Sequence, residues 1–188
     1  MRAVGAYRRP TGGVLVAARE PSTLGPDDGL GTRLGQAGAI AIAGETSATA
    51  SILRELRHRI LGSGGAPRVR RIAHEVARFA KHVYRTKHAK SGDLYIAFAG
   101  VSASGAVNIW LCESPHFNNH MLEGPEAQQP VILGRDDMRQ RVRRSLTATP
   151  DTESLDAFAQ NLNAAVGSEL QAVGCVHKTT TIDADGVR

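Results

Sequence analysis

Histidines are the side chains in this sequence whose spacing comes closest to that of a metal site. His74 is followed by Glu75, but the second histidine of the H-E-x-x-H zinc pattern is absent. His74 and His82 are eight residues apart and roughly share one helix face. His116 and His120 form a second pair in an expected loop. A zinc ion in a protein takes three or four protein ligands, and we expect no third ligand to complete either pair, so the histidines predict no metal site.

Hydroxyl side chains are numerous, but none lies in a sequence context that makes it a nucleophile. The G-x-S-x-G elbow that presents a catalytic serine is absent. The glycine-rich stretches GGV at 12–14 and GSGG at 62–65 lack the lysine and the helix context of a phosphate-binding loop, so we expect turns there. The threonines at 179–181 are predicted to be polar positions of an exposed strand. These residues therefore predict no cofactor.

Positive charge is concentrated in two stretches of the chain. The formal net charge is +5, and residues 54–90 hold eleven lysines and arginines against two glutamates. A second cluster of five arginines lies within residues 135–144. Such clusters are typical of surfaces that bind nucleic acid or an acidic protein, although a solvated helix face gives the same pattern. The first stretch lacks interleaved aromatic residues and a nucleic-acid recognition motif. Four of its arginines recur near helical spacing and form a possible basic binding surface: Arg68, Arg71, Arg78 and Arg85.

The composition predicts a single folded domain over residues 1–188, which is long enough to bury a full core. Hydrophobic residues make up 41% and charged residues 22%, which argues against disorder. Aromatic residues are only 4%, so we expect a core of small and branched aliphatic side chains. No apolar run approaches the ~18 residues of a membrane helix, and the first twenty residues lack a signal peptide's apolar core. We expect a cytoplasmic protein without membrane contact, in which Cys112 and Cys175 are buried free thiols.

Hydrophobic periodicity predicts the elements that must position these side chains. Helices are predicted at 46–61, 67–89, 135–146 and 151–170. Strands are predicted at 2–7, 13–18, 37–44, on both sides of the turn 102–105 within 93–113, near 116–124, at 128–134 and at 171–186. Helices thus follow one another in pairs, which argues against a doubly wound parallel sheet. The order favours an α+β fold, a four-layer αββα sandwich in which two antiparallel sheets lie between helix pairs.

This order and several local strings resemble the β-subunits of proteasomes, a family of N-terminal-nucleophile (Ntn) hydrolases. The matching stretches are GGVLVAAREPSTLG, TRLGQAGAIAIAGETSATASILRELR, LYIAFAGVSASGAVNIWLCE and GCVHKTTTIDADGVR. They cover nearly the whole chain and match the family in element order, spacing and small-residue strands. The resemblance implies that the αββα sandwich is of the Ntn-hydrolase, proteasome-like type.

The resemblance also implies where an active site would lie. In the family, the hydroxyl of an N-terminal threonine attacks a carbonyl and the threonine's own amine acts as the base, with a lysine and an aspartate in support. In this sequence Ala3 falls at the nucleophile, Arg19 at the aspartate and Arg33 at the lysine. A guanidinium does not release its proton at neutral pH. Leu170 and Val173 fall at a supporting aspartate and serine. The resemblance therefore implies degenerate active-site positions and no catalytic residue.

Three functional hypotheses follow. The first is a proteasome-like subunit with a structural or scaffolding role, which self-associates into rings or dimers or assembles with a catalytically complete proteasome-like subunit. The second is an active threonine-type peptidase or amidohydrolase whose nucleophile is generated by processing. The third is a basic module that binds nucleic acid. In proteasome-like assemblies the helices that correspond to the basic ones lie at subunit or ring contacts, which directs the basic surface toward an acidic protein surface.

Overall fold

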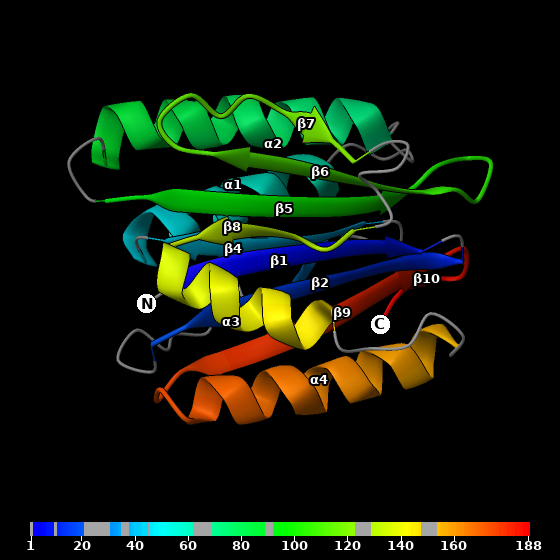
Figure 1. Ribbon diagram of the computed structural model, residues 1–188. Coiled ribbons are helices and arrows are strands. Elements are labelled where there is room, and N and C mark those ends of the chain that lie inside the picture. The colour runs from blue at the N-terminus through cyan, green and yellow to red at the C-terminus, as the bar shows by residue number, and fades with distance from the viewer. Residues whose placement is uncertain are drawn as a thin grey trace.

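The computed structural model describes residues 2–9, 11–20, 31–34, 38–44, 46–61, 69–88, 92–122, 129–147 and 154–188. Within these residues the chain forms two antiparallel sheets and four α-helices (Figure 1). The mixed α+β class with two antiparallel sheets, predicted from the periodicity, is confirmed.

The first sheet, sheet A, has five strands in the order β10-β9-β2-β1-β8. Its strands are β1 (Arg2–Arg9), β2 (Gly12–Arg19), β8 (Val131–Gly134), β9 (Val176–Asp183) and β10 (Gly186–Val187). The predicted hairpin at the start of the chain is present and pairs along its whole length, from Arg2 opposite Arg19 to Arg9 opposite Gly12.

The second sheet, sheet B, has five strands in the order β3-β4-β5-β6-β7. Its strands are β3 (Thr32–Arg33), β4 (Gly38–Gly44), β5 (Leu94–Val101), β6 (Val107–Glu113) and β7 (His120–Met121). The hairpin of β5 and β6 forms the middle of this sheet, as its two apolar runs predicted.

The helices are α1 (Thr46–Leu61), α2 (Val69–Val83), α3 (Asp136–Thr147) and α4 (Leu155–Gln171), and a π-helical turn η2 (Tyr84–His88) continues α2. Helix α4 begins after Ser154, whose side-chain oxygen accepts a hydrogen bond from the backbone N–H of Ala157. This is the N-cap interaction that satisfies a free amide of the first turn. The helix therefore begins four residues later than the predicted start at 151.

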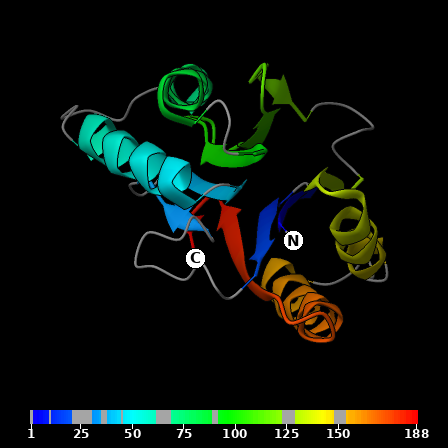
Figure 2. The same ribbon diagram turned by 90° about the vertical axis from the view of Figure 1, so that its left-hand side faces the viewer.

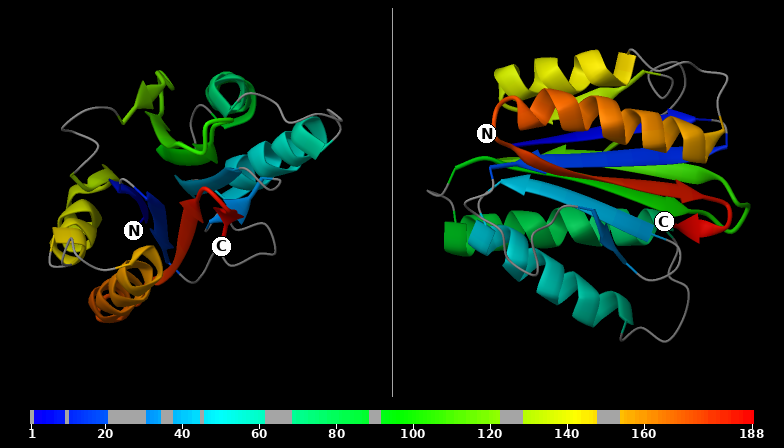
Figure 3. Two further views of the ribbon diagram at one scale, coloured as in Figure 1. Left: turned by 90° about the vertical axis from the view of Figure 1, so that its right-hand side faces the viewer. Right: turned by 90° about the horizontal axis from the view of Figure 1, so that it is seen from below.

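The two sheets lie face to face, and a helix pair covers the outer face of each. Helices α1 and α2 pack on sheet B, whereas α3 and α4 lie side by side on sheet A (Figures 2 and 3). Three apolar clusters fill the spaces between these layers. The α1/α2 cluster includes Ile40, Ile42, Leu53, Val76, Phe98 and Trp110. The inter-sheet cluster includes Val4, Leu15, Ala17, Ala41, Ala97 and Leu111. The α3/α4 cluster includes Ala3, Val16, Ala18, Phe158, Leu162 and Leu170.

Small residues allow the two sheets to approach each other closely. In β4 the alanines at 39, 41 and 43 belong to the inter-sheet cluster, while Ile40 and Ile42 belong to the α1/α2 cluster. Successive side chains of a strand point to opposite faces, so the alternation places the small residues against sheet A and the large ones against the helices. On the other face of sheet B, Gly100 in β5 allows helix α2 to approach closely, because a Cβ there would lie 2.3 Å from Cγ1 of Val69 in α2.

Two edge strands were missed by the sequence analysis, and one predicted strand was too long. Strands β3 and β10 have two residues each, which is too short to produce a periodic pattern. The predicted strand over 171–186 begins only at Val176, because Leu170 in the last turn of α4 accepts hydrogen bonds from the amides of Val173 and Cys175. Among the residues that the structure describes, no helix is long and apolar enough to cross a membrane.

Candidate functional site

The position expected for a nucleophile is buried in an apolar layer. Ala3 is the second residue of β1 and pairs with Ala18 of β2 on one side and Gly134 of β8 on the other. Its side chain is 1% exposed and belongs to the α3/α4 cluster. Gly134 makes this approach possible, because a Cβ there would lie 2.8 Å from Cα and Cβ of Ala3. The geometry therefore serves strand packing at this position.

Arg19 lies close to Ala3 in the sheet but on its other face. Arg19 is the last residue of β2, where it pairs with Arg2 of β1 and Val176 of β9. Ala18 belongs to the α3/α4 cluster and Ala17 to the inter-sheet cluster, so alternation directs the Arg19 side chain toward sheet B. The residue is only 4% exposed. The sheet thus separates the Arg19 side chain from that of Ala3.

Arg33 lies on the edge strand β3 of sheet B, and its guanidinium bridges the two sheets. Its Nη2 donates a hydrogen bond to the carbonyl oxygen of Val187 in β10, the edge strand of sheet A. Val187 pairs with Ile182, whereas the β9 partner of Arg19 is Val176. Six residues of an extended strand span about 20 Å, so the Arg33 guanidinium lies at the opposite end of sheet A from Arg19 and Ala3.

Leu170 and Val173 lie where α4 ends. Leu170 is fully buried in the α3/α4 cluster, and Val173 is partly buried against it. The carbonyl oxygen of Leu170 accepts hydrogen bonds from the amides of Val173 at 3.1 Å and Cys175 at 2.9 Å. These contacts close the last turn of the helix. The structure therefore brings Ala3, Leu170 and Val173 into one apolar cluster and places both arginines elsewhere.

Three of the four arginines proposed as a basic surface lie on an exposed face of α2 and η2. Arg71, Arg78 and Arg85 are exposed and seven residues apart, a spacing that keeps them on one side of a helix. We call these three residues the α2 basic stripe. Arg71 forms an ion pair with Glu75, with Nε 3.0 Å from Oε1. Arg68 lies outside the described residues.

The aromatic residues nearest the α2 basic stripe face the core. Phe79 and Tyr84 are partly buried and pack against the α1/α2 cluster. The ring of Tyr84 lies 5.5 Å from that of Phe117, centroid to centroid. Neither ring is therefore placed as an open platform on which a nucleic-acid base stacks beside the arginines.

The histidine pairs are not joined by further ligands in the part of the chain that the structure describes. There, no group of three histidine, cysteine, aspartate or glutamate side chains is placed to hold a metal ion. Nδ1 of His74 lies 3.4 Å from the amide nitrogen of Asn119. His116 and His120 are exposed.

Both cysteines are buried and neither forms a disulfide. Burial raises the pKa of the Cys112 thiol to about 12, and the charge of Glu113 adds to the effect. Burial also raises the pKa of Cys175, whose Sγ faces the carbonyl oxygen of Val173. A thiol with a raised pKa is a poor nucleophile because the thiolate is the reactive form. The cysteines therefore offer no substitute for a catalytic threonine.

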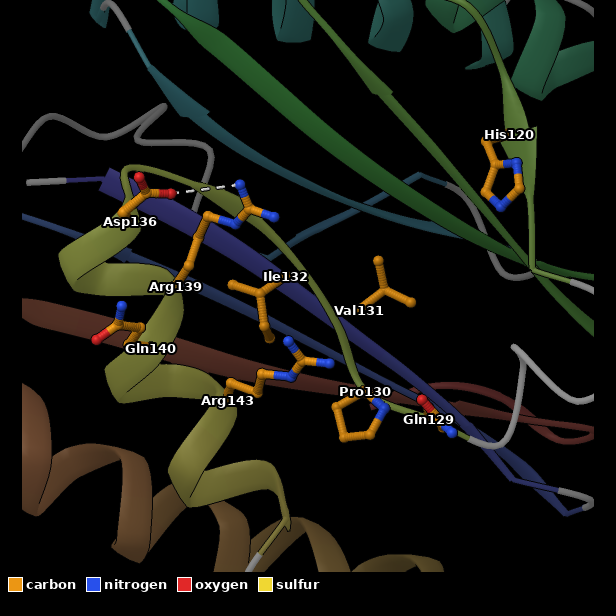
Figure 4. A pocket seen from close by; sticks show the side chains of 9 residues that line it. All are labelled: His120, Gln129, Pro130, Val131, Ile132, Asp136, Arg139, Gln140 and Arg143. Atoms are coloured by element: carbon orange, nitrogen blue, oxygen red, sulfur yellow. Dashed lines mark ion pairs between the residues drawn. The ribbon is translucent and has the colours of Figure 1, made fainter.

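A pocket of about 440 Å³, which the sequence did not predict, lies at the edge of the sandwich. It lies between β7, β8 and α3, so its walls come from both sheets (Figure 4). Arg139 and Arg143 of the second arginine cluster lie on its α3 wall, and His120 of the second histidine pair lies on its β7 side; both groups were noted in the sequence, but their proximity was not. The pocket is lined by His120, Gln129, Pro130, Val131, Ile132, Asp136, Arg139, Gln140 and Arg143.

Comparison with known proteins assigns no family to this chain. No model of a known protein family matches it, and a search of curated proteins returned no match.

Proposed function

We propose that this chain is a proteasome-β-like subunit of the Ntn-hydrolase fold, with a degenerate active site and a structural role in a homo- or hetero-oligomeric assembly. Support comes from the element order, in which two antiparallel sheets face each other and consecutive helix pairs cover their outer faces. The observation that carries the proposal is the dispersal of the active-site positions. Ala3 lies in the α3/α4 cluster, Arg19 lies on the other face of the same sheet, and Arg33 binds the far end of that sheet.

This dispersal argues against the threonine-type mechanism. In that mechanism the threonine's own amine is the base, and the supporting lysine and aspartate must lie within hydrogen-bond reach of the N-terminal residue, about 2.6–3.2 Å. The rise of an extended strand places the Arg33 guanidinium about 20 Å along sheet A from Arg19 and its paired residues. A guanidinium moreover does not release its proton at neutral pH, so an arginine in place of the lysine or the aspartate supplies no base.

The catalytic half of the proposal is tested with fluorogenic peptides and an epoxyketone that labels N-terminal threonines. We expect no hydrolysis and no labelled mass, with a catalytically complete proteasome as the positive control. Labelling of the chain at a single residue, with turnover that the same reagent abolishes, would establish the second hypothesis and contradict ours.

The assembly half is tested by light scattering at micromolar concentration, alone and with an isolated proteasome-like partner subunit. We expect either a mass that is a multiple of the chain mass in the first sample, or a mass that is a sum of both chains' masses in the second. The α2 basic stripe is the surface that we assign to the contact, since its arginines complement an acidic protein surface. Arg78→Glu combined with Arg85→Glu should lower the assembled fraction, whereas the exposed Arg144→Glu on α3 should not. A strict monomer in both samples contradicts a structural role.

Nucleic-acid binding is the second candidate for the same arginines. Phosphate contacts by lysine and arginine produce an affinity that falls steeply with salt. The inward-facing Phe79 and Tyr84 favour the protein partner instead. A band-shift titration with single- and double-stranded oligonucleotides at low salt separates the two candidates. A shift that is lost at higher salt and in the Arg78→Glu, Arg85→Glu variant would assign the α2 basic stripe to nucleic acid.

A further inference from the structure

The sandwich has two open sides, where edge strands of the two sheets face each other, and the contacts between these strands differ. On one side the edge strands β3 and β10 are joined by the hydrogen bond from Arg33 to the carbonyl oxygen of Val187. On the other side the edge strands are β7 and β8, and the pocket lies there (Figure 4). None of the degenerate active-site positions lines this pocket, so its chemistry is independent of the function proposed above.

His120 reaches the pocket from sheet B. It pairs with Leu111, which belongs to the inter-sheet cluster. Paired residues of neighbouring strands have their side chains on the same face of a sheet, so the His120 imidazole points from β7 toward sheet A. Helix α3 and strand β8 supply the opposite wall, as Figure 4 shows.

Cationic groups dominate the ionisable lining of the pocket. Arg139 and Arg143 are four residues apart on α3 and therefore lie on adjacent turns of one helix face. Like charges at this spacing destabilise a helix slightly when nothing lies between them. The acidic lining residue is Asp136, whose carboxylate lies 3.5 Å from Nη1 of Arg139.

That ion pair leaves most of the positive charge available to a ligand. The Asp136 side chain is 90% exposed and that of Arg139 is 52% exposed, so the pair is weak and easily rearranged. Arg143 forms no ion pair with any residue that the structure describes, and Figure 4 shows its side chain directed toward β8. The amide of Gln129 adds a neutral hydrogen-bonding group to the rim.

The apolar lining of the pocket comes from the edge of the sandwich at β8. Pro130 precedes β8, and Val131 and Ile132 begin it. Successive strand side chains point to opposite faces, so Ile132, which is 6% exposed, lies on the α3 side and Val131 on the side of sheet B (Figure 4). Binding sites for small molecules combine such an apolar surface with a few polar groups that fix the orientation of the ligand, in volumes of roughly 300–1,000 Å³. Arginine in particular binds the planar or tetrahedral oxygens of carboxylate and phosphate through paired N–H groups.

We propose that this pocket binds a small organic anion, in which a phosphate or carboxylate head joins a short apolar body. The head binds between the guanidinium groups of Arg139 and Arg143, and the body crosses the edge of β8 from the side of Ile132 to that of Val131. His120 closes the site from the other sheet. Because the two walls belong to different sheets, a bound anion joins their edges on the side opposite the Arg33 hydrogen bond.

The test is a titration with phenyl phosphate at constant ionic strength, followed by amide resonances and by calorimetry. Benzoate tests the carboxylate head, benzyl alcohol the apolar body without charge, and inorganic phosphate the charge without the body. We expect saturable binding of phenyl phosphate or benzoate that is tighter than that of inorganic phosphate, with shifts at 129–132 and 136–143. Benzyl alcohol should bind more weakly than either aromatic anion.

Variants distinguish a built site from general attraction of anions to a basic surface. Arg143→Gln removes a charge-assisted contact and should weaken binding by about tenfold or more. Asp136→Asn removes the competing carboxylate and should strengthen binding a few-fold. Arg144→Gln is the matched control, because Arg144 is exposed and adjacent but does not line the pocket. Absence of saturable binding, or an equal loss in Arg143→Gln and Arg144→Gln, overturns the proposal.

Discussion

Replacement of Phe158 tests whether α4 packs on sheet A as the layer order requires. Phe158 is 1% exposed, and its ring stacks on Tyr7 of β1 with centroids 5.0 Å apart and an interplanar angle of 29°. The guanidinium carbon of Arg9 lies 4.9 Å from the centroid of the same ring. The side chain therefore joins a helix of the outer layer to two residues of the first strand.

The expected magnitude follows from these contacts. Truncation of a buried phenylalanine to alanine costs about 3–5 kcal/mol of unfolding free energy, through lost burial and the cavity left behind. For a chain of this length that corresponds to a fall in Tm of roughly 6–20 °C. The stacked pair with Tyr7 should contribute about 0.5–1.5 kcal/mol of this as a coupling energy.

Urea unfolding at fixed protein concentration, followed by the fluorescence of the single tryptophan, measures these quantities. A double-mutant cycle with Phe158→Leu and Tyr7→Leu isolates the coupling energy. Phe79→Leu on α2 is the matched control and should be additive with Tyr7→Leu, since the two residues pack in different clusters. A loss below about 1 kcal/mol for Phe158→Ala, or a coupling of zero in the Tyr7 cycle, would refute the packing described for α4.

Three further predictions concern thiol reactivity, pH dependence and close packing. In the native protein Cys112 and Cys175 should react with a thiol reagent at pH 8 far more slowly than in urea, because burial raises both pKa values; rapid native labelling would contradict this. Burial lowers the pKa of the His177 imidazole from its ordinary 6.5. On acidification the unfolded chain therefore protonates this imidazole at a higher pH than the folded chain does. The contribution of neutral His177 to the free energy of unfolding is complete above about pH 6.5 and should fall as the pH drops below 6.5. The urea midpoint should fall less between neutral and mildly acidic pH in the His177→Gln variant than in the wild type. An unchanged dependence of the midpoint on pH would contradict the role given to His177. Gly100→Ala should lower the free energy of unfolding by about 1–3 kcal/mol through overpacking against Val69, and Val69→Ala in the same chain should recover part of that loss. Strictly additive losses in the double variant would show that the two positions do not touch.

The fold was largely predictable because its strands and helices are long enough to show their periods. The short apolar run bounded by glycines at 37–44 predicted a buried strand, and β4 (Gly38–Gly44) is buried on both faces. The pairing of helices along the chain predicted that each sheet has a helix pair on one face. The strands β3 and β10 were not predictable, since two residues contain no period and their pairing depends on sheets already formed.

The candidate site was predictable only as a set of residue types. The resemblance predicted that the positions of a nucleophile and its supporting groups hold Ala3, Arg19, Arg33, Leu170 and Val173. The sequence alone determined where positive charge accumulates along the chain, because charge is a property of residues one by one.

Tertiary structure decided which of these residues meet. Strand alternation directs Ala3 and Arg19 to opposite faces of sheet A, and the position of β3 at a sheet edge takes Arg33 to Val187. The pocket between α3, β8 and β7 is likewise a consequence of how the two sheets face each other. His120 and Arg143 are far apart in sequence, and local periodicity contains no information about contacts between separate layers. Such contacts arise only when the apolar faces of both sheets are buried together.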